Sequence, residues 1–312
     1  MQITTVCVIG GSGFVGRHLC QQLAARGYRV RVPTRDRERA KALSLLPTVE
    51  IVVADVHNPV ALAAVVQGCD AVINLVGVLH DARGPRGFAG AHVLLAHKVA
   101  EACNAGDVRR LLHMSALAAA ADAPSDYLRS KGGAERVVLG SGLDATVFRP
   151  SVIFGPDDSF LNLFARLLSL FPVMPLGSPN ARFQPVYVAD VAAAFVRALT
   201  DRTTFGRSYD LCGPKRYTLR ELVAYVGAVT GHPRPVIGLN RALSMLQAAA
   251  LELLPVKLMS RDNVRSMQID SVCDCPFPFG IKPQALEAVA PSWLAARTPR
   301  ARYQRLRDIA GR

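Results

Sequence analysis

The sequence predicts an α/β protein built on a doubly wound parallel β-sheet, with a smaller C-terminal lobe. Two observations predict this fold. The first 150 residues alternate apolar, β-branched runs with helical stretches, a pattern typical of a parallel sheet covered by helices on both faces. A glycine-rich turn stands directly after the first of these runs. With 312 residues, half of them hydrophobic, the chain is long and apolar enough to bury the core that such a sheet needs.

The expected strands are short apolar runs, and most neighbouring runs are far enough apart to hold a helix between them. Because parallel strands need crossover connections of fixed hand, we expect the helices to cover both faces of the sheet. The strands are expected over residues 4–9, 29–32, 49–53, 71–75, 110–114 and 145–149, and the helices over residues 14–26, 37–45, 60–66, 91–105 and 127–140.

The pattern loosens after Pro150, where proline and glycine cluster and the apolar runs shorten. We therefore expect a nucleotide-binding domain over residues 1–155 and a smaller substrate or partner lobe over residues 156–312. The elements expected in this second lobe are helices over residues 188–200 and 219–229 and a strand over residues 208–212.

Two apolar stretches, residues 160–171 and 242–254, are too short and too interrupted by polar residues to span a membrane. Helices that line a core or an apolar pocket are the first interpretation, and an interfacial membrane contact is the alternative. The seven cysteines are scattered, which favours reduced thiols. Cys273 and Cys275 are too isolated for a zinc site, so no metal is expected.

The formal net charge of +13, from 37 Lys and Arg against 24 Asp and Glu, indicates an anionic partner. Residues 297–312 hold six Arg and one Asp, and this basic tail favours an acidic membrane surface or an acidic, membrane-associated protein. No recognised nucleic-acid module supports nucleic-acid binding. Because the first strand begins almost at once, with no recognisable presequence, we expect a cytoplasmic protein, with the inner face of the plasma membrane as a peripheral location.

Glycines at positions 10, 13 and 16 lie between the first strand and the first helix, in the spacing GxxGxxG. Gly10 permits the tight turn, Gly13 lets the backbone approach a pyrophosphate, and Gly16 lets the helix pack closely on the sheet. Amides at the helix N-terminus then hold the anion. This context predicts a Rossmann-type dinucleotide site, to which the neighbouring residues Ser12, Phe14 and Val15 also belong.

The end of the second strand indicates which dinucleotide binds. An acid there binds the ribose of NAD, whereas Arg accommodates the 2′-phosphate of NADP. Thr34 stands where the acid is expected and Arg35 follows it, which favours NADP(H). A shift of two residues makes Asp36 the ribose ligand and leaves NAD(H) open. Asp55, with Val56, is placed to contact adenine.

Ser115 follows the fifth strand, and Tyr127 and Lys131 share one face of the next helix, four residues apart. A neighbouring ammonium stabilises a phenolate, so we expect Lys131 to lower the pKa of Tyr127 from its ordinary value near ~10. Tyr127 is then the proton-exchanging group, Lys131 also holds the nicotinamide ribose, and Ser115 polarises a carbonyl. Val76 and Gly77, after the fourth strand, provide a small residue beneath the cofactor.

These motifs, in this order, resemble the extended or atypical branch of the short-chain dehydrogenase/reductase superfamily, whose members include NAD-dependent epimerases and dehydratases. The resemblance covers about residues 1–230. It implies that the segment containing Pro150 and Val152 touches nicotinamide, and that His92 stands where the family has an Asn in a proton relay. Within the superfamily, residues 260–264 and 286–294 are similar to the group of the nucleotide-binding accessory subunit of respiratory complex I and its bacterial relatives.

Three functions follow as expectations. The first is an NADPH-dependent oxidoreductase of a small, apolar carbonyl or quinone-like compound. The second, implied by the resemblance to the complex I group, is a non-catalytic nucleotide-binding accessory or assembly protein of a membrane-associated complex. The third is a nucleoside-diphosphate-sugar epimerase or dehydratase, which the short segment of eleven residues between Ser115 and Tyr127 disfavours.

Overall fold

The computed structural model describes residues 3–82, 84–253 and 258–295. Its first unit is built on a seven-stranded sheet in the order β11-β6-β5-β4-β1-β2-β3, and every neighbouring pair is parallel. This confirms the predicted doubly wound sheet. The strands are Thr5–Ile9 (β1), Arg29–Thr34 (β2), Val49–Val53 (β3), Ala71–Asn74 (β4), Arg110–Met114 (β5), Asp144–Pro150 (β6) and Arg207–Leu211 (β11).

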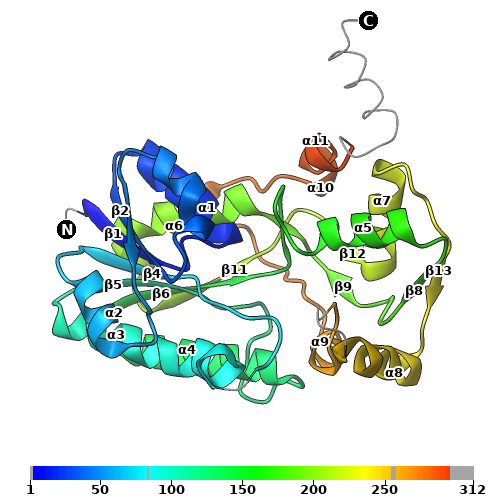
Figure 1. The fold of residues 1–312 in the computed structure, drawn as a ribbon, viewed down its shortest axis with the longest axis horizontal. Coiled ribbons are helices and arrows are strands. Elements are labelled where there is room, and N and C mark those ends of the chain that lie inside the picture. Colours follow the sequence, from blue (N-terminus) through cyan, green and yellow to red (C-terminus); the bar gives the residue numbers. More distant parts are fainter. Residues whose placement is uncertain (1–2, 83, 254–257, 296–312) are drawn as a thin grey trace, which may run out of the picture. The chain divides into compact units, whose positions relative to one another are not determined.

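Helices cover both faces of this sheet (Figure 1). On one face, α1 (Phe14–Ala25) packs against α6 (Val188–Thr200). On the other face lie α2 (Pro59–Val66), α3 (Leu95–Ala105) and α4 (Asp126–Leu139), whose apolar side chains form a core cluster with those of the strands.

Two of these helices begin at a residue that satisfies the free amides of the first turn. The Asn58 side chain accepts hydrogen bonds from the amides of Val60 and Ala61 at the start of α2. The Ser125 side chain accepts one from the Leu128 amide at the start of α4. Such caps stabilise a helix by about 1 kcal/mol, and the cap at Ser125 fixes the beginning of the helix that carries Tyr127 and Lys131.

Two expected helices differ from regular α-helices. Glu38–Leu45 forms a 3₁₀ helix (η1) that buries only Ala40 and Leu43. The helix expected from residue 91 begins instead with a π-helical turn, Ala89–Leu94 (η3), and continues as α3. Gly90 in this turn packs so closely that a β-carbon on it would lie 2.5 Å from the Gly84 carbonyl oxygen.

The chain divides into two units that each use separate stretches of sequence. The first comprises the residues up to Pro150, then Val188–Leu211 and Cys275–Ile281, and the second comprises the remainder. A single boundary after residue 155 therefore does not describe the molecule. The expected assignment of residues 188–200 and 208–212 to the second lobe is corrected, because β11 pairs with β6 as the seventh strand and α6 packs on α1.

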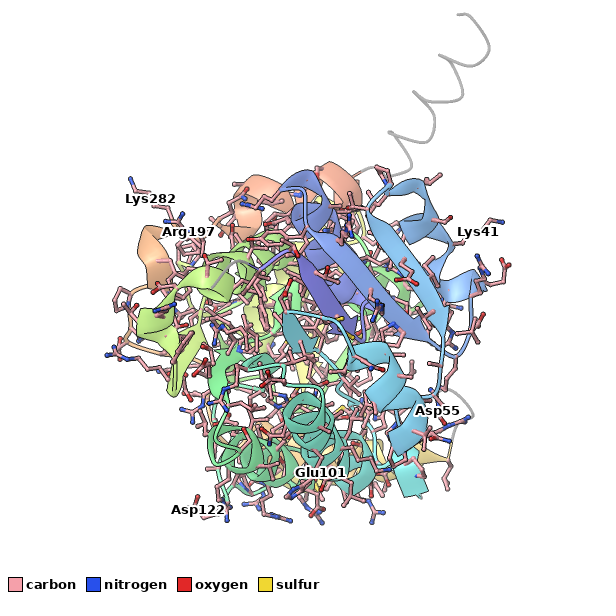
Figure 2. The ribbon with its side chains drawn as sticks, turned by 90° about the vertical axis from the view of Figure 1, so that its left-hand side faces the viewer. Lys41, Asp55, Glu101, Asp122, Arg197 and Lys282 are labelled. Carbon is pink, nitrogen blue, oxygen red and sulfur yellow. The ribbon has the colours of Figure 1, made fainter. Side chains whose placement is uncertain are left out.

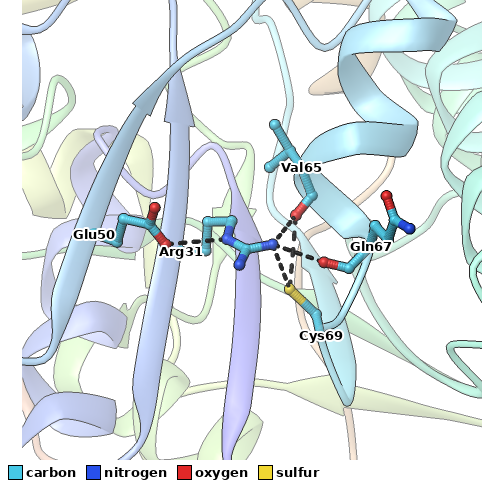
Figure 3. Close-up of polar contacts among 5 residues, drawn as sticks. All are labelled: Arg31, Glu50, Val65, Gln67 and Cys69. Atoms are coloured by element: carbon cyan, nitrogen blue, oxygen red, sulfur yellow. Dashed lines mark hydrogen bonds and ion pairs between the residues drawn. The ribbon is translucent and has the colours of Figure 1, made fainter.

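Arginine side chains tie elements of the first unit together. Arg31 on β2 donates from Nη1 to the carbonyl oxygens of Val65 and Gln67, at 2.9 and 2.8 Å, where α2 ends (Figure 3). It also pairs with Glu50 on β3. Arg110 on β5 is fully buried and donates to oxygens near the end of α6 and on β6. The acceptors are Ala198 O, Leu199 O and Thr204 Oγ1, and on β6 Asp144 O and Thr146 Oγ1.

The second unit is made of very short strands and helices around an apolar core. Helix α5 (Leu161–Leu170) contributes Leu161, Ala165 and Leu168 to this core, as expected for the first apolar stretch. The remaining elements are β7 (Ile153–Phe154), β8 (Met174–Leu176), β9 (Arg182–Phe183), β10 (Val186–Tyr187), β12 (Tyr217–Thr218), α7 (Leu219–Val229), β13 (Val236–Gly238), α8 (Arg241–Glu252), α9 (Arg261–Ser266), α10 (Leu286–Val289) and α11 (Pro291–Leu294), together with short 3₁₀ turns elsewhere in the chain.

The second apolar stretch forms α8, which buries only Ser244 and Ala248. Its leucines Leu243 and Leu246, and Leu253 just after it, stay 48%, 67% and 86% exposed. Among the described residues no helix is both long and apolar enough to cross a membrane. The basic tail, residues 297–312, lies outside the described residues.

The cysteines depart from the expectation of seven reduced thiols. Cys273 and Cys275 are disulfide-bonded. The five other cysteines are buried and lie outside any disulfide: Cys7, Cys20, Cys69, Cys103 and Cys212. The described residues contain no group of His, Cys, Asp and Glu that could hold a metal ion.

Candidate functional site

The glycine turn joins β1 to α1 at the carboxyl end of the sheet. Gly10 has a φ of +85°, which L side chains rarely adopt. A β-carbon on Gly16 would lie 2.3 Å from the Gly10 carbonyl oxygen, so the helix can pack this closely only with glycine. Gly13 stands at the N-cap of α1, and no side chain caps that helix. The first-turn amides can therefore bind an anion such as a pyrophosphate.

The neighbouring candidates of the turn lie where the motif predicts. Ser12 and Phe14 are half-buried, whereas Val15 is buried. Val15 packs inward from the first turn of α1, and the Phe14 ring contacts the His18 ring edge-on at 5.8 Å. The turn is thus anchored by apolar side chains on one side while its backbone stays accessible at Gly13.

At the end of β2, the side chain of Thr34 is used by the turn itself. Its Oγ1 donates to the Asp36 carbonyl oxygen at 2.9 Å and accepts from the Asp36 amide at 3.2 Å. The Asp36 carboxylate accepts from the Glu38 amide and pairs with Arg39 at 3.5 Å. Arg35 is exposed, so its guanidinium can reach a ligand, while the Asp36 carboxylate is held by its own loop.

Asp55 follows β3 and lies at the surface (Figure 2). Its Oδ1 accepts a hydrogen bond from the His57 amide at 3.1 Å, and Val56 between them is half-buried. One carboxylate oxygen thus shapes the turn. Asn74 at the end of β4 does the same, because its Oδ1 accepts from the Val76 amide at 3.1 Å.

Lys131 is buried beneath the segment that follows β4. Its Nζ donates to the carbonyl oxygens of Met114 and Val76, at 3.2 and 3.4 Å. A β-carbon on Gly77 would lie 2.9 Å from this Nζ. Gly77 therefore makes room for the Lys131 ammonium. This contact explains why a glycine stands here, whereas the sequence suggested that a small residue was needed beneath the cofactor.

Burial changes the protonation of both residues of the Tyr/Lys pair. It lowers the pKa of Lys131 from 10.5 to about 8, partly offset by Glu135, and raises the pKa of Tyr127 from 10.0 to about 12. The expectation that Lys131 lowers the tyrosine pKa is thus wrong for this structure, because loss of hydration dominates. At neutral pH Tyr127 is a protonated phenol and Lys131 an ammonium.

Ser115 directly follows β5 and is 3% exposed. Its Oγ is buried and has no hydrogen-bond partner among the described residues. Leaving a buried hydroxyl unpaired costs about 1–3 kcal/mol, so a ligand oxygen placed there gains a ready donor. Lys131 lies against the same strand end through the Met114 carbonyl.

His92 lies in the π-helical turn and is 1% exposed. Its Nε2 accepts a hydrogen bond from the Val78 amide at 3.0 Å, and its Nδ1 lies 2.7 Å from Ser130 Oγ. Its ring also contacts the Tyr127 ring at 5.7 Å. The structure thus brings His92 to the Tyr/Lys helix. Ser130 and Val78 are partners that sequence reasoning missed, although Ser130 lies within the YxxxK motif.

The last two candidates fall in different units. Pro150 ends β6 in the first unit, and its carbonyl oxygen accepts from the Leu117 amide at 3.0 Å. Val152 belongs to the second unit, where its carbonyl oxygen accepts from the Val186 amide at 3.0 Å.

A match to a protein-family model shows to which family the chain belongs. Residues 6–212 match the model of the NAD dependent epimerase/dehydratase family. The chain belongs to this family. The match covers the glycine turn, Ser115, Tyr127 and Lys131. The family uses a nicotinamide dinucleotide, and the uncapped helix behind Gly13 fits its pyrophosphate.

Relatives extend the likeness beyond the family model. The chain is 38% identical, over 69% of its length and 55% of the relative's, to the mitochondrial NADH dehydrogenase [ubiquinone] 1 alpha subcomplex subunit 9 of Arabidopsis thaliana. The subunit of that name in Mus musculus is 30% identical over 90% of this chain and 77% of its own. A ceramide reductase of Caulobacter vibrioides is 35% identical over 61% of this chain and 59% of its own length. This confirms the resemblance to an atypical short-chain dehydrogenase/reductase and to the complex I group.

Among solved structures, the chain is similar to an NADPH-dependent quinone oxidoreductase from Escherichia coli in complex with NADPH. The TM-score is 0.74 at 19% identity, covering 93% of this chain and 99% of that one. A dTDP-glucose 4,6-dehydratase from Streptomyces venezuelae with NAD bound gives a TM-score of 0.71 at 21% sequence identity, covering 96% of this chain and 98% of that one. These likenesses show the fold shared by this epimerase/dehydratase family member and proteins that bind either dinucleotide.

Proposed function

We propose that this protein is an NADP(H)-dependent oxidoreductase that reduces a small, apolar carbonyl or quinone-like compound. The observation that carries the proposal is the buried, unpartnered Oγ of Ser115 at the strand end that Lys131 also contacts. A donor without a partner in a buried site suits an oxygen that gains negative charge during the reaction.

The protonation of Tyr127 supports the reductive direction. With a pKa of about 12 the phenol keeps its proton at neutral pH and can donate it to the substrate oxygen. Ser115 Oγ donates a hydrogen bond to the same oxygen, and the Met114 carbonyl oxygen holds the Lys131 ammonium at this end of β5. When bound, the reduced dinucleotide supplies the hydride to the carbonyl carbon, so the products are an alcohol and the oxidised dinucleotide.

The proposed role of Tyr127 is tested by the Tyr127→Phe substitution. NADPH oxidation is followed by absorbance with a panel of aldehydes and quinones, and the variant is expected to lose about 100-fold in rate. Tyr28→Phe is the matched control, because Tyr28 precedes β2 at the amino end of the parallel sheet, whereas Ser115 follows β5 at its carboxyl end. Full activity of Tyr127→Phe on a compound that the parent protein reduces would falsify the proposed mechanism.

The preference for NADP(H) is proposed from Arg35. Its guanidinium is exposed next to the end of β2, and a charge-assisted hydrogen bond to a 2′-phosphate favours NADPH over NADH. Arg35→Ala is expected to weaken NADPH binding roughly tenfold and to leave NADH binding nearly unchanged. Arg37→Ala, an exposed arginine of the same loop, is the control. Equal weakening for the two dinucleotides contradicts the proposal.

A non-catalytic accessory protein of a membrane-associated complex is the second candidate. The exposed leucines of α8, Leu243 and Leu246, favour it by offering an apolar contact surface, and complex I subunits are among the relatives. Such a protein would work at the inner face of the plasma membrane. Tightly held dinucleotide, identified by mass spectrometry, together with no turnover on any compound of the panel, favours this candidate over the enzyme. Sugar-nucleotide epimerisation, the third candidate, is supported by the family match alone.

A further inference from the structure

The hydrogen bonds of His92 determine where its ring carries a proton. Ser130 Oγ donates its single proton to the Tyr127 carbonyl oxygen at 2.7 Å. The 2.7 Å contact between Ser130 Oγ and His92 Nδ1 must then use a proton of the ring. On the other side, the Val78 amide donates to Nε2, which must offer a lone pair. These contacts describe a neutral imidazole protonated on Nδ1.

The surroundings of the ring also disfavour the charged form. Burial lowers the pKa of His92 most strongly, and the nearby Lys131 and His113 lower it further, to about 2. His113 is 1% exposed, and neither of its ring nitrogens has a partner among the described residues. The aromatic rings of Phe88 and Tyr127 pack against the imidazole at 5.7 Å each. Among the described residues no carboxylate is a cause of the His92 pKa shift, so none stabilises a positive charge on the ring.

The contacts of His92 with Val78 and Ser130 connect the segment after β4 to helix α4, which carries Tyr127 and Lys131. Val78 belongs to the segment after β4 that includes Val76 and Gly77, against which the Lys131 ammonium packs. Ser130 lies on α4 between Tyr127 and Lys131. The ring spans these segments from the π-helical turn, a local structure frequent at functional sites.

We infer that His92 is a positioning residue, not a proton relay: as a permanently neutral Nδ1–H imidazole it fixes the segment 76–78 against the helix that carries Tyr127 and Lys131. This role goes beyond the proposed function, because the arrangement of α4 against the dinucleotide segment matters for an enzyme and for an accessory protein alike. A relay must exchange protons at both nitrogens, whereas both are occupied here by bonds within the protein.

The decisive experiment is ¹⁵N NMR of the full-length protein labelled on histidine, which distinguishes tautomers directly. The His92 ring is expected to stay neutral and protonated on Nδ1 between about pH 5 and pH 8. Proton exchange to an imidazolium in this range, or protonation on Nε2, overturns the inference. The signal is assigned by its loss in His92→Gln. Should that variant not fold, Ser130→Ala serves instead, because it shifts the Nδ1 signal by removing its acceptor.

Dinucleotide binding gives a second readout that needs no turnover. Titrated with NADPH, Ser130→Ala and His92→Gln are each expected to weaken binding by roughly fivefold, and the double variant by no more than the larger single effect, because both remove one connection. His97→Gln, on the exposed face of α3, is the control and is expected to bind as the parent does. Fully additive losses contradict a shared connection.

If the protein turns over a substrate, the pH profile separates positioning from relay. A positioning residue lowers kcat in His92→Gln without changing the shape of its pH profile. A relay would remove one of its pKa values. If no compound is turned over, the proposed enzymatic function is wrong. The NMR and binding results then still test the role of His92.

Discussion

The two units differ in how many charged side chains they bury: among the described residues the first unit buries Arg110, Lys131, Glu135 and Asp190, and the second buries only Asp158. Arg110, Lys131 and Glu135 lie inside the first unit at 0%, 2% and 4% exposure, each bonded to carbonyl oxygens or to another side chain. In the second unit, Leu246 and Phe171 stay 67% and 51% exposed. Buried charge is thus concentrated in the unit that carries the large sheet, whereas exposed large apolar side chains occur in both units, Leu45 of the first among them.

The largest effect on stability is expected from a substitution of Arg110, which is buried in the first unit. Arg110→Met removes the buried hydrogen bonds to Leu199 O, Ala198 O and Thr204 Oγ1. Bonds to a charged donor contribute about 1.5–3 kcal/mol each, although Ala198 O keeps the Asp201 amide and Thr204 Oγ1 keeps Thr146 Oγ1. We expect about 4 kcal/mol of destabilisation, measured by urea unfolding. Arg109→Met, an exposed neighbour, is the control. A loss below about 1 kcal/mol would show that the buried polar contacts of the first unit are replaceable.

In the second unit the apolar core should matter most. Leu222 on α7 is fully buried in the core cluster of that unit. Leu222→Ala removes apolar contacts and leaves a cavity, and we expect a loss of about 3 kcal/mol in unfolding free energy. An effect as small as that of an exposed leucine would contradict the view that this unit depends on apolar packing.

Lys131 gives the first unit a dependence on pH. Its pKa is lowered to about 8 from 10.5, so between these values the unfolded chain binds more protons than the folded one. The free energy of unfolding therefore rises with pH over this interval, by about 2 kcal/mol from pH 8 to 10 for this residue. Subtracting the profile of Lys131→Met from that of the parent isolates this rise.

The control for this pH profile is Lys41→Met. Lys41 is 80% exposed and lies at the surface (Figure 2), so its variant should keep the full rise. A parent profile that is flat from pH 8 to 10 contradicts the lowered pKa of Lys131, and a rise that survives in Lys131→Met shows that another group is responsible.

The smallest effect is expected on α8. Leu246→Ala changes a 67% exposed side chain, and we expect a change within about 0.5 kcal/mol by the same urea measurement. A loss approaching that of Leu222→Ala would mean that this leucine is covered in solution. Self-association is checked in parallel by sedimentation.

Six of the seven strands of the sheet could be predicted, because each is a local apolar run. The seventh, β11, could not be assigned to its unit. Only Leu211 of this strand is buried, and Arg207 is exposed. Its pairing with β6 joins Arg207 to Thr146, far away in the sequence. Helix α6 was predicted by its own periodicity and misplaced for the same reason, because non-local pairing leaves no local pattern.

The residue types of the candidate site follow from spacing, but their electrostatics do not. Gly10, Ser115 and Tyr127 are found from motifs and their order. The direction of the Tyr127 pKa shift could not be predicted, because its cause is the burial of the phenol, which arises only once the helix is packed. The partners of His92 depend on a side-chain rotamer at Ser130 and a backbone amide at Val78, and neither leaves a signal in the sequence.

The chain passes from one unit to the other five times, since its order is residues 1–150, 151–187, 188–211, 212–274, 275–281 and then 282–312. During synthesis, β6 therefore remains an edge strand until β11 has left the ribosome, about sixty residues later. An unpaired edge is open to pairing with other chains. Fragments that stop before Leu211 are thus expected to aggregate, and a chaperone that binds nascent chains has a defined interval in which to act.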